Sequence, residues 1–403
     1  MKPLSLYIHI PFCEQKCNYC DFLSFPAQDG VRSAYLTALK HELLFRAKDF
    51  GKEGEDAREI ISAYIGGGTP SVLEADQIDE ILRILYTYYE IAKDCEISME
   101  VNPGTVDFEK LKAYRVAGIN RLSIGCQSMQ DEELQKLGRI HTKEDIHTTY
   151  QAAREAGFTN INIDLMSALP DQSFDDYIDS VAQVVDLQPE HISAYALILE
   201  EGTPFYEEYS EEVRDEDLDL EMYEETCKYL TGHGYEQYEI SNYARKCESG
   251  CDTEASGQEA CTPLQDHDYR CRHNVVYWKR GEYLGLGLGA SSLISETRFR
   301  NTEDIDAYIA ADGNADTMME DMEVLNYHAR MEEFMFLGLR MTEGISIRDF
   351  EETFHHPIRR IYAKAIDNLV SDGLLTVEGD RISLTRTGIN VSNYALAQFL
   401  FDE

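Results

Sequence analysis

The stretch YIHIPFCEQKCNYCDF, residues 7–22, places three cysteines within eight residues directly behind a run of apolar residues. A structural zinc site takes four ligands and disulfides use cysteines in pairs, so Cys13, Cys17 and Cys20 match neither habit. Thiolates are also the ligands of iron–sulfur clusters, and three of them leave one iron of a [4Fe-4S] cluster free. The loop therefore predicts a [4Fe-4S] cluster with one open iron, which suits a chelating cofactor.

A zinc ion is the alternative occupant of such cysteine groups. At the first loop, zinc would need a fourth ligand such as His9 or Asp21. A second four-thiolate site, for zinc or another cluster, would have to form around residues 246–270, although its gaps are longer than those of typical zinc sites. Its four cysteines are Cys247, Cys251, Cys261 and Cys271.

Short apolar runs alternate with amphipathic helical patterns from Leu4 to about residue 233, and this unit repeats about six times. A repeated strand and helix predicts a parallel α/β sheet, and six units favour an open, partial (βα)6 barrel over a closed barrel of eight. The predicted strands span residues 4–10, 59–66, 95–101, 119–125, 158–166 and 191–199. The predicted helices between them span residues 31–48, 78–89, 108–118, 144–157 and 174–187.

Changes in composition divide the chain into four parts. Residues 1–245 hold the barrel core, residues 246–270 are polar and unperiodic and are predicted to be an inserted surface loop, and residues 271–315 continue the core. Helices followed by a two-stranded hairpin then predict a mostly helical, winged-helix-like domain over residues 320–403. Winged-helix folds often bind DNA, but this segment lacks a basic surplus, so the likeness concerns the fold only.

The composition excludes several classes of partner. The 403 residues include 36 Lys and Arg against 75 Asp and Glu, a net charge of -39, which disfavours nucleic acids and anionic membrane surfaces. No apolar run approaches the about 18 residues of a membrane span, and the apolar N-terminal stretch is too short for a signal peptide. We therefore expect a cytoplasmic protein with no integral membrane segment.

Polar residues follow three neighbouring predicted strands at the point where each strand ends. Glu100 ends the third strand, Gln127 follows the fourth and Asp164 ends the fifth, while residues 66–68 are three glycines at the end of the second. The carboxyl ends of parallel strands lie at one edge of a sheet, where α/β proteins bind ligands. We expect a ligand site there. Each polar residue taken singly could instead cap a turn, and the glycines could form a tight turn.

Several sequence blocks resemble, in order, those of one family. They are YIHIPFC, YIGGGTPS, MEVNPGT, GINRLSIGCQS, INIDLMSALPDQ, EISNYA, CRHNVVYW and YLGLGLGASS. Together with the cysteine spacing, they identify the chain as similar to the radical S-adenosylmethionine (radical SAM) family, in the group of oxygen-independent coproporphyrinogen III oxidase and the heme chaperones. The resemblance covers most of residues 4–300 and extends to the C-terminal domain. It implies a radical-SAM barrel that binds S-adenosylmethionine on the cluster.

The resemblance also implies roles for individual residues. Tyr7, Gly67 and Glu100 match positions that serve the cofactor on the cluster. Other residues match positions that hold a second S-adenosylmethionine in the oxidase, although Arg139 could equally be a surface cation. LPDQ has Asp171 where the family more often has glycine, which affects the adjacent turn. The second set is Tyr19, Gly68, Thr69, Gln127, Arg139, Asp164 and Ala196.

Two features separate the chaperone branch from the oxidase. The oxidase has a further cysteine two residues after the third cluster ligand, where this chain has Phe22. Residues 273–278, His-Asn-Val-Val-Tyr-Trp, resemble a block implicated in heme binding, in which His273 would ligate iron and Tyr277 and Trp278 would stack on the porphyrin. Cys271 is an alternative heme ligand. A buried, hydrogen-bonded packing role for His273 is the other interpretation.

The resemblance thus predicts a protein that binds a [4Fe-4S] cluster, S-adenosylmethionine and heme, and that transfers heme to hemoproteins. Its partners would be those hemoproteins and an electron donor such as flavodoxin or ferredoxin, and a homodimer is compatible with it. The alternatives are the oxidase of porphyrin biosynthesis and a zinc-stabilised binding module. No catalytic residue is assigned.

Overall fold

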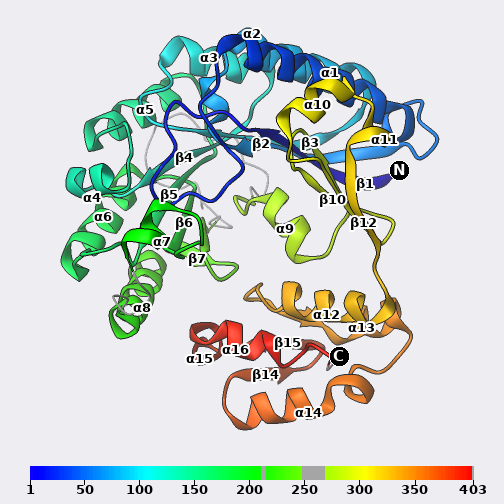
Figure 1. Cartoon of the computed structure of the whole chain (residues 1–403). Coiled ribbons are helices and arrows are strands. Elements are labelled where there is room, and N and C mark those ends of the chain that lie inside the picture. The colour runs from blue at the N-terminus through cyan, green and yellow to red at the C-terminus, as the bar shows by residue number, and fades with distance from the viewer. Residues whose placement is uncertain (210–214, 247–267, 402–403) are drawn as a thin grey trace, which may run out of the picture.

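The computed structural model describes residues 1–209, 215–246 and 268–401. The chain begins with the predicted alternation of strand and helix, and Figure 1 shows the helices of this repeat along the outer side of a curved sheet. The predicted α/β fold with a partial (βα)6 barrel is confirmed. Its strands are β1 (Lys2–Ile10), β2 (Arg58–Gly67), β3 (Glu90–Val101), β4 (Arg121–Gln127), β5 (Ile161–Ser167) and β6 (His191–Ala196). Its helices are α1 (Asp29–Phe50), α2 (Ala75–Tyr88), α3 (Phe108–Ala117), α4 (Asp131–Lys136), α5 (Lys143–Glu155) and α6 (Phe174–Leu187), with a short 3-10 turn at Pro70–Val72.

Within the described residues, the sheet extends beyond the six predicted strands on both sides. Its order is β12-β11-β10-β9-β1-β2-β3-β4-β5-β6-β8-β7, so β1 lies inside the sheet and not at its edge. Strands β1 to β6 pair in parallel, and β9 pairs in parallel with β1. The added strands were not predicted because they are short and lack a clear alternation. They are β7 (Tyr235–Gln237), β8 (Asn242–Arg245), β9 (Tyr283–Leu286), β10 (Ser291–Ile294), β11 (Thr297–Asn301) and β12 (Met319–Val324).

Burial of the first strand explains why it takes a central position. Leu4, Leu6, Ile8 and Ile10 have no exposed surface and belong to the main apolar cluster. Residues at alternate positions of a strand share one face, so these four side chains form a continuous apolar row. Strands covered on both faces are typical of parallel sheets flanked by helices.

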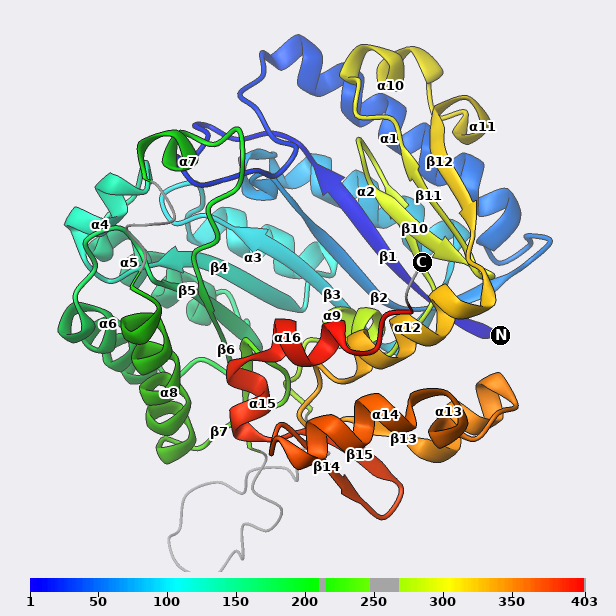
Figure 2. The same ribbon diagram turned by 60° about the horizontal axis from the view of Figure 1, so that its bottom comes forward.

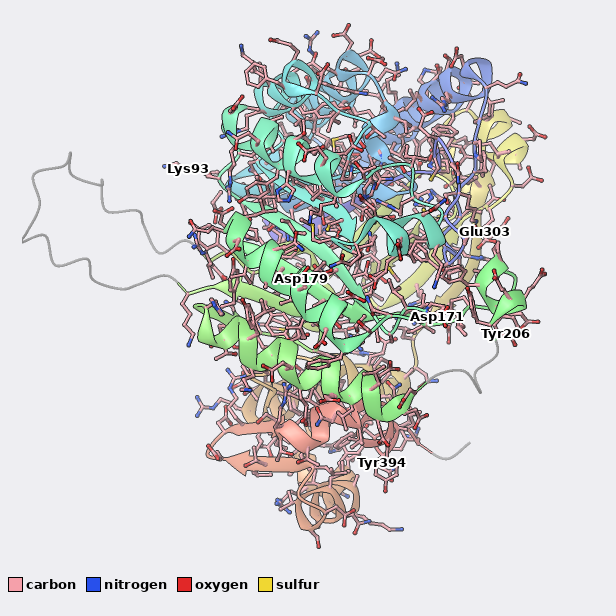
Figure 3. All side chains as sticks on the ribbon, turned by 90° about the vertical axis from the view of Figure 1, so that its left-hand side faces the viewer. Lys93, Asp171, Asp179, Tyr206, Glu303 and Tyr394 are labelled. Atoms are coloured by element: carbon pink, nitrogen blue, oxygen red, sulfur yellow. The ribbon has the colours of Figure 1, made fainter. Side chains whose placement is uncertain are left out.

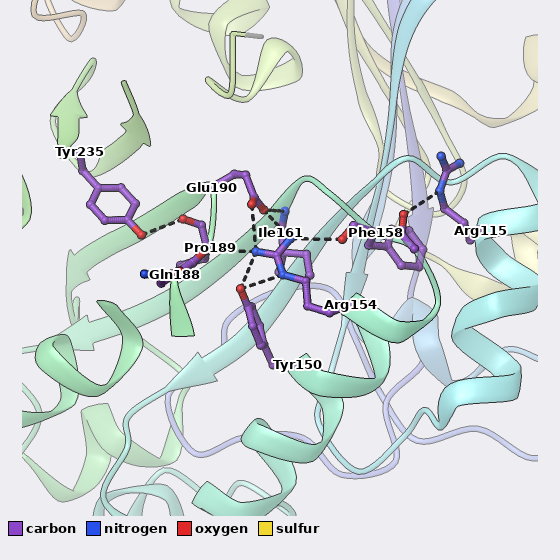
Figure 4. Close-up of polar contacts among 10 residues, drawn as sticks. Arg115, Tyr150, Arg154, Phe158, Ile161, Gln188, Pro189, Glu190 and Tyr235 are labelled. Carbon is purple, nitrogen blue, oxygen red and sulfur yellow. Dashed lines mark hydrogen bonds and ion pairs between the residues drawn. The ribbon is translucent and has the colours of Figure 1, made fainter. Parts of the chain in front are cut away.

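A polar network lies at the amino ends of the parallel strands, where β5 begins. Arg154 of α5 binds both carboxylate oxygens of Glu190, at 2.8 and 2.9 Å. Glu190 also accepts a hydrogen bond from the backbone nitrogen of Ile161, at 3.0 Å. Figure 4 shows Arg154 at the centre of this network, with the Tyr150 ring beside it. The network therefore joins α5 to the starts of β5 and β6.

The C-terminal elements form a second unit with its own apolar cluster. Their order, helix–strand–helix–helix–strand–strand, is that of a winged helix, and in the described chain the strands form a three-stranded sheet, β13-β15-β14. The boundary predicted at residue 320 falls within β12 of the large sheet. The elements are α12 (Tyr327–Gly338), β13 (Ile345–Ser346), α13 (Ile347–Phe354), α14 (Ile358–Ser371), β14 (Leu375–Glu378), β15 (Arg381–Leu384), α15 (Arg386–Asn390) and α16 (Ser392–Ala397).

Helix α9 (Arg272–Trp278) lies between the large sheet and the C-terminal unit, where it contacts β2 and α12 (Figures 1 and 2). The remaining helices are α7 (Pro204–Glu208), α8 (Glu216–Gly232), α10 (Ile305–Ala311) and α11 (Ala315–Met318). Figure 3 shows charged side chains such as Asp171, Asp179 and Glu303 on the outside of the molecule. Among the helices of the described ranges, we find none long and apolar enough to cross a membrane.

Candidate cluster and cofactor site

A cavity of about 130 Å³ lies at the carboxyl ends of the central strands, beside the cysteine loop. Its lining combines the cysteine loop with residues from the ends of β2 to β6. The predicted residues that it brings together are Cys13, Cys17, Tyr19, Cys20, Gly67, Gly68, Thr69, Glu100, Gln127, Arg139 and Asp164.

The cysteine loop presents its three thiols to this cavity. Two of them have a hydrogen-bond donor beside them: Thr69 Oγ1 lies 3.4 Å from Cys13 Sγ, and Arg139 Nη1 lies 3.7 Å from Cys17 Sγ. Burial raises the pKa of Cys20. Donors beside sulfur stabilise thiolates and tune iron–sulfur clusters. Three sulfur ligands, two donors and an adjoining cavity therefore fit a [4Fe-4S] cluster with a cofactor next to it.

One of the two residues considered as a fourth zinc ligand, His9, is already engaged in this arrangement. Both ring nitrogens of His9 are engaged, Nδ1 with the Tyr7 hydroxyl at 3.0 Å and Nε2 with the Leu23 carbonyl oxygen at 2.9 Å. In the three described ranges, no group of three or more His, Cys, Asp and Glu side chains is arranged to hold a single metal ion. Three cysteines of the second proposed thiolate site, Cys247, Cys251 and Cys261, lie outside the described residues.

The glycines that end β2 are required by the protein's own packing. Gly67 has φ +115°, and a Cβ atom there would lie 2.4 Å from the His9 imidazole. A Cβ atom on Gly68 would lie 2.7 Å from the carbonyl oxygen of Phe12. Glycine thus allows β2 to pass close to the start of the cysteine loop. There the backbone nitrogens of Gly68 and Thr69 donate hydrogen bonds to the carbonyl oxygens of Ile10 and Phe12.

Glu100 closes the cavity wall next to these glycines. Its carboxylate accepts hydrogen bonds from the Tyr64 hydroxyl, at 2.9 Å, and from the backbone nitrogen of Gly67, at 3.0 Å. Burial raises the pKa of Glu100 to about 7, and the nearby charge of Asp164 acts in the same direction. Glu100 is therefore partly protonated near neutral pH in the cofactor-free protein.

The neighbouring strands supply two further polar groups, Asp164 and Gln127. Asp164 accepts hydrogen bonds from Asn162 Nδ2 at 2.7 Å and Ser123 Oγ at 3.0 Å, and burial raises its pKa. Gln127 has φ +69° and accepts a hydrogen bond from the Tyr195 hydroxyl, at 3.2 Å. These side chains line one wall of the cavity.

Arg139 points into the cavity and is not a surface cation. Its Nη2 donates to Asn102 Oδ1 at 2.7 Å and to the Gly125 carbonyl oxygen at 2.6 Å. Nearby, Asp171 adopts φ +59°, so the turn survives with aspartate in place of the family's glycine. Its carboxylate accepts a hydrogen bond from Lys136 Nζ at 2.9 Å.

Of the predicted S-adenosylmethionine residues, all of which are described, Tyr7 and Ala196 lie outside the cavity lining. Tyr7 instead packs behind the cavity, with its ring stacked against Tyr64 at a centroid distance of 6.4 Å. Sequence reasoning missed Asn102, which lies in the quoted MEVNPGT block and faces Arg139. It also missed Tyr195, whose contact with Gln127 joins two strands.

Comparison with known proteins agrees with this geometry. Residues 7–184 match the Radical SAM superfamily and residues 325–391 match the HemN C-terminal domain. The solved structure of coproporphyrinogen III oxidase (HemN) from Escherichia coli, described as a radical SAM enzyme, has a TM-score of 0.81 and 23% identity. That match covers 99% of this chain and 90% of the oxidase chain, and it shows a shared fold.

Curated relatives distinguish between the heme chaperone branch and the oxidase branch. "Heme chaperone HemW" from Bacillus subtilis is 33% identical over 98% of this chain and 99% of its own length. The protein of the same name from Lactococcus lactis is 31% identical over 100% of this chain and 98% of its own length. The one from Escherichia coli is 36% identical over 73% of this chain and 71% of its own length. The chain belongs to the HemW heme chaperone family. The family assignment favours the chaperone branch over the oxidase.

The block that suggested heme binding in this HemW family member is enclosed in the structure. His273 is 2% exposed, and its ring nitrogens contact Ser62 Oγ at 3.1 Å and the Tyr277 hydroxyl at 3.0 Å. Cys271 is 1% exposed, lies 3.6 Å from Glu96 Oε1, and has its pKa raised by burial to about 12. In this conformation, neither residue is open to a ligand, and His273 has the packing role that was the alternative.

Trp278, at the end of the same helix, occupies a different position. The centre of its ring lies 4.4 Å from the Arg340 guanidinium carbon, and it lines a cavity of about 170 Å³ between α9 and the C-terminal unit. The predicted heme residues are therefore divided between the interior of the barrel and the boundary with the C-terminal unit.

Proposed function

We propose that this protein is a radical-SAM heme chaperone. It holds a [4Fe-4S] cluster on Cys13, Cys17 and Cys20, binds S-adenosylmethionine in the adjoining cavity, and transfers bound heme to hemoproteins. The observation that carries the proposal is the three-thiol loop facing a cavity at the carboxyl ends of the strands, in a chain of the HemW family. Four further features stay predictions: heme-receiving partner proteins, an electron donor such as flavodoxin or ferredoxin, a homodimer and a cytoplasmic location.

Different residues at the cavity would bind the cluster and the cofactor. The three cysteines would ligate the cluster, while Thr69 and Arg139 donate hydrogen bonds to two of their sulfurs. Glu100 and the backbone of Gly67 would present polar groups to the methionyl end of the cofactor. A bound, reduced cluster would supply one electron to the sulfonium group of S-adenosylmethionine. The enclosing cavity wall would shield reactive species from water.

Anaerobic reconstitution with iron and sulfide tests the cluster. We expect a brown protein whose iron content falls strongly in Cys13→Ala, because three thiolates are needed to hold the cluster. Cys227→Ala is the matched control, since Cys227 lies in α8 and outside the cavity lining. Zinc without iron in the wild-type preparation would contradict the proposal.

A heme titration of the reconstituted protein tests the chaperone function. We expect a saturable change in the heme absorption spectrum, followed by spectral gain of an added apo-hemoprotein as heme is transferred. Absence of heme binding would contradict the proposal. Conversion of coproporphyrinogen III to protoporphyrinogen IX, detected by mass spectrometry with S-adenosylmethionine and reductant, would favour the oxidase instead.

A further inference from the structure

His273 is connected to the cofactor cavity through the ring of Tyr64. The two rings stack with a centroid distance of 5.2 Å and an interplanar angle of 24°. The Tyr64 hydroxyl donates to Glu100 Oε1 at 2.9 Å, and Glu100 Oε2 accepts from the Gly67 nitrogen at 3.0 Å. A continuous set of contacts therefore runs from α9 to the cavity wall.

His273 is itself held in one orientation. Ser62 contacts its Nδ1 and Tyr277 contacts its Nε2, while the Glu96 carboxylate accepts a hydrogen bond from its backbone nitrogen at 3.3 Å. Ser62 and Tyr64 are two residues apart on β2, so they lie on the same face of the strand. The imidazole thus bonds to one of these residues and stacks on the other. Burial lowers the pKa of His273 to about 3, so the stacked ring is neutral.

Among the aromatic pairs of the described residues, only His273 and Tyr7 stack on the Tyr64 ring. The Tyr7 contact is longer, with a centroid distance of 6.4 Å. Loss of the His273 side chain would leave space beside Tyr64 inside a buried region, and a ring with such space samples other rotamers. Its hydroxyl would then no longer be held at Glu100.

We propose that His273 is a positioning residue of the S-adenosylmethionine site: it fixes the Tyr64 ring so that the Tyr64 hydroxyl holds Glu100 against Gly67. This inference rests on the proposed function, because it takes the cavity as the S-adenosylmethionine site. Ligation of heme iron by His273 would require the imidazole to give up one of its two nitrogen contacts.

Binding of S-adenosylmethionine to the anaerobically reconstituted protein tests the proposal. We expect the dissociation constant to rise about tenfold in His273→Ala and in Tyr64→Phe, the loss expected for one hydrogen bond in the site. His273→Phe keeps a ring over Tyr64 and should restore affinity to within about threefold of wild type. Val276→Ala on the same helix is the control and should bind as wild type does.

Two further readouts separate positioning from a general loss of structure and from heme ligation. The change that S-adenosylmethionine causes in the electron paramagnetic resonance spectrum of the reduced cluster should weaken in His273→Ala and return in His273→Phe. Heme affinity should be the same in His273→Ala and wild type. Unchanged S-adenosylmethionine affinity in Tyr64→Phe, which only loses a hydroxyl, would overturn the proposal. Unchanged S-adenosylmethionine affinity in His273→Ala would also overturn it, and loss of heme affinity in that variant would then assign His273 to heme. Failure of the wild-type protein to bind either ligand would instead contradict the proposed function.

Discussion

At the scale of single residues, burial sets the charge and shape of the cavity. Glu100, Gln127 and Asp164 were expected at one sheet edge because each ends a parallel strand, and the structure brings them together. Their hydrogen-bond partners could not be predicted. The contact between Gln127 and Tyr195, for example, depends on the registers of β4, β5 and β6.

Glu100 should make stability depend on pH. Its pKa is raised to about 7 in the folded protein, whereas in the unfolded chain it keeps the ordinary value of 4.5. The folded state therefore binds the proton more tightly, and this contribution to stability is present below the unfolded pKa and lost as pH rises through 7. The loss is on the order of 3 kcal/mol. Glu100→Gln cannot ionise and should lack it.

Urea unfolding of the cofactor-free wild-type and Glu100→Gln proteins, at about pH 5 and about pH 7.5, checks this prediction. The free energy of unfolding of the wild type should fall relative to that of the variant between the two pH values. Parallel pH profiles would mean that Glu100 titrates alike in the folded and unfolded states.

Gly67→Ala should damage the site more than a matched glycine substitution. Gly67 and Gly157 both have positive φ, but the added Cβ would meet the His9 ring at 2.4 Å at Gly67 and nothing within 4 Å at Gly157. Both variants should lose about 1–2 kcal/mol of unfolding free energy from backbone strain. Gly67→Ala should lose roughly 1–3 kcal/mol more and bind S-adenosylmethionine less well. Urea unfolding and ligand binding measure both effects, and equal losses in the two variants would argue against the clash.

At the scale of elements, the long periodic helices and strands were predictable and the short ones were not. β1 to β5 have seven to twelve residues with apolar runs, β6 has six, and β7 to β12 have three to six. The predicted final strand, residues 191–199, ends early, with β6 at Ala196. Short strands form because a neighbouring strand offers hydrogen-bond partners. The local sequence does not show which strand will be the neighbour.

Helix α9 depends on an acidic residue from a distant strand. Glu96 of β3 accepts hydrogen bonds from the backbone nitrogens of Arg272, at 2.9 Å, and His273, at 3.3 Å, at the start of the helix. A carboxylate there satisfies unpaired donors and favours the helix dipole. Glu96→Ala should loosen α9 and expose Cys271, which is 1% exposed.

Alkylation of the native protein, mapped by mass spectrometry, checks this prediction. Cys271 should react several-fold faster in Glu96→Ala than in wild type, since loss of a helix cap costs about 1 kcal/mol. Asp94→Ala is the control, because Asp94 also pairs with Arg272, at 3.0 Å, but its side chain is 76% exposed. Equal rates in all three proteins would show that Glu96 does not hold the helix.

At the scale of the whole molecule, Glu333 joins the C-terminal unit to the large sheet. Its buried carboxylate accepts hydrogen bonds from Arg280 Nε at 2.8 Å and Arg298 Nη2 at 2.6 Å. Loss of Glu333 leaves Arg280 with Glu296 as its remaining partner and Arg298 partly solvated, so we expect a cost of about 1–3 kcal/mol. Glu333→Ala should therefore release the C-terminal unit from the barrel.

Calorimetry should detect this release as an unfolding transition of the C-terminal unit at lower temperature than that of the barrel. Glu343→Ala is the matched control, because Glu343 pairs with Lys279 across the same boundary, at 2.9 Å, with both side chains more than a third exposed. Surface pairs contribute ~0–1 kcal/mol, so this variant should unfold as wild type does. Identical scans for both variants would show that Glu333 does not join the two units.

The amino-acid sequence by itself determined the strand and helix repeat, the three-thiol loop and the family, because periodicity and motif spacing are local properties of the chain. Tertiary structure decided which side chains meet. It enclosed His273 against Tyr64, placed Arg139 beside Cys17, and divided the 271–278 block between the barrel interior and the boundary with the C-terminal unit. Those contacts join residues distant in the chain, so burial and register in the folded molecule decide them and local pattern does not.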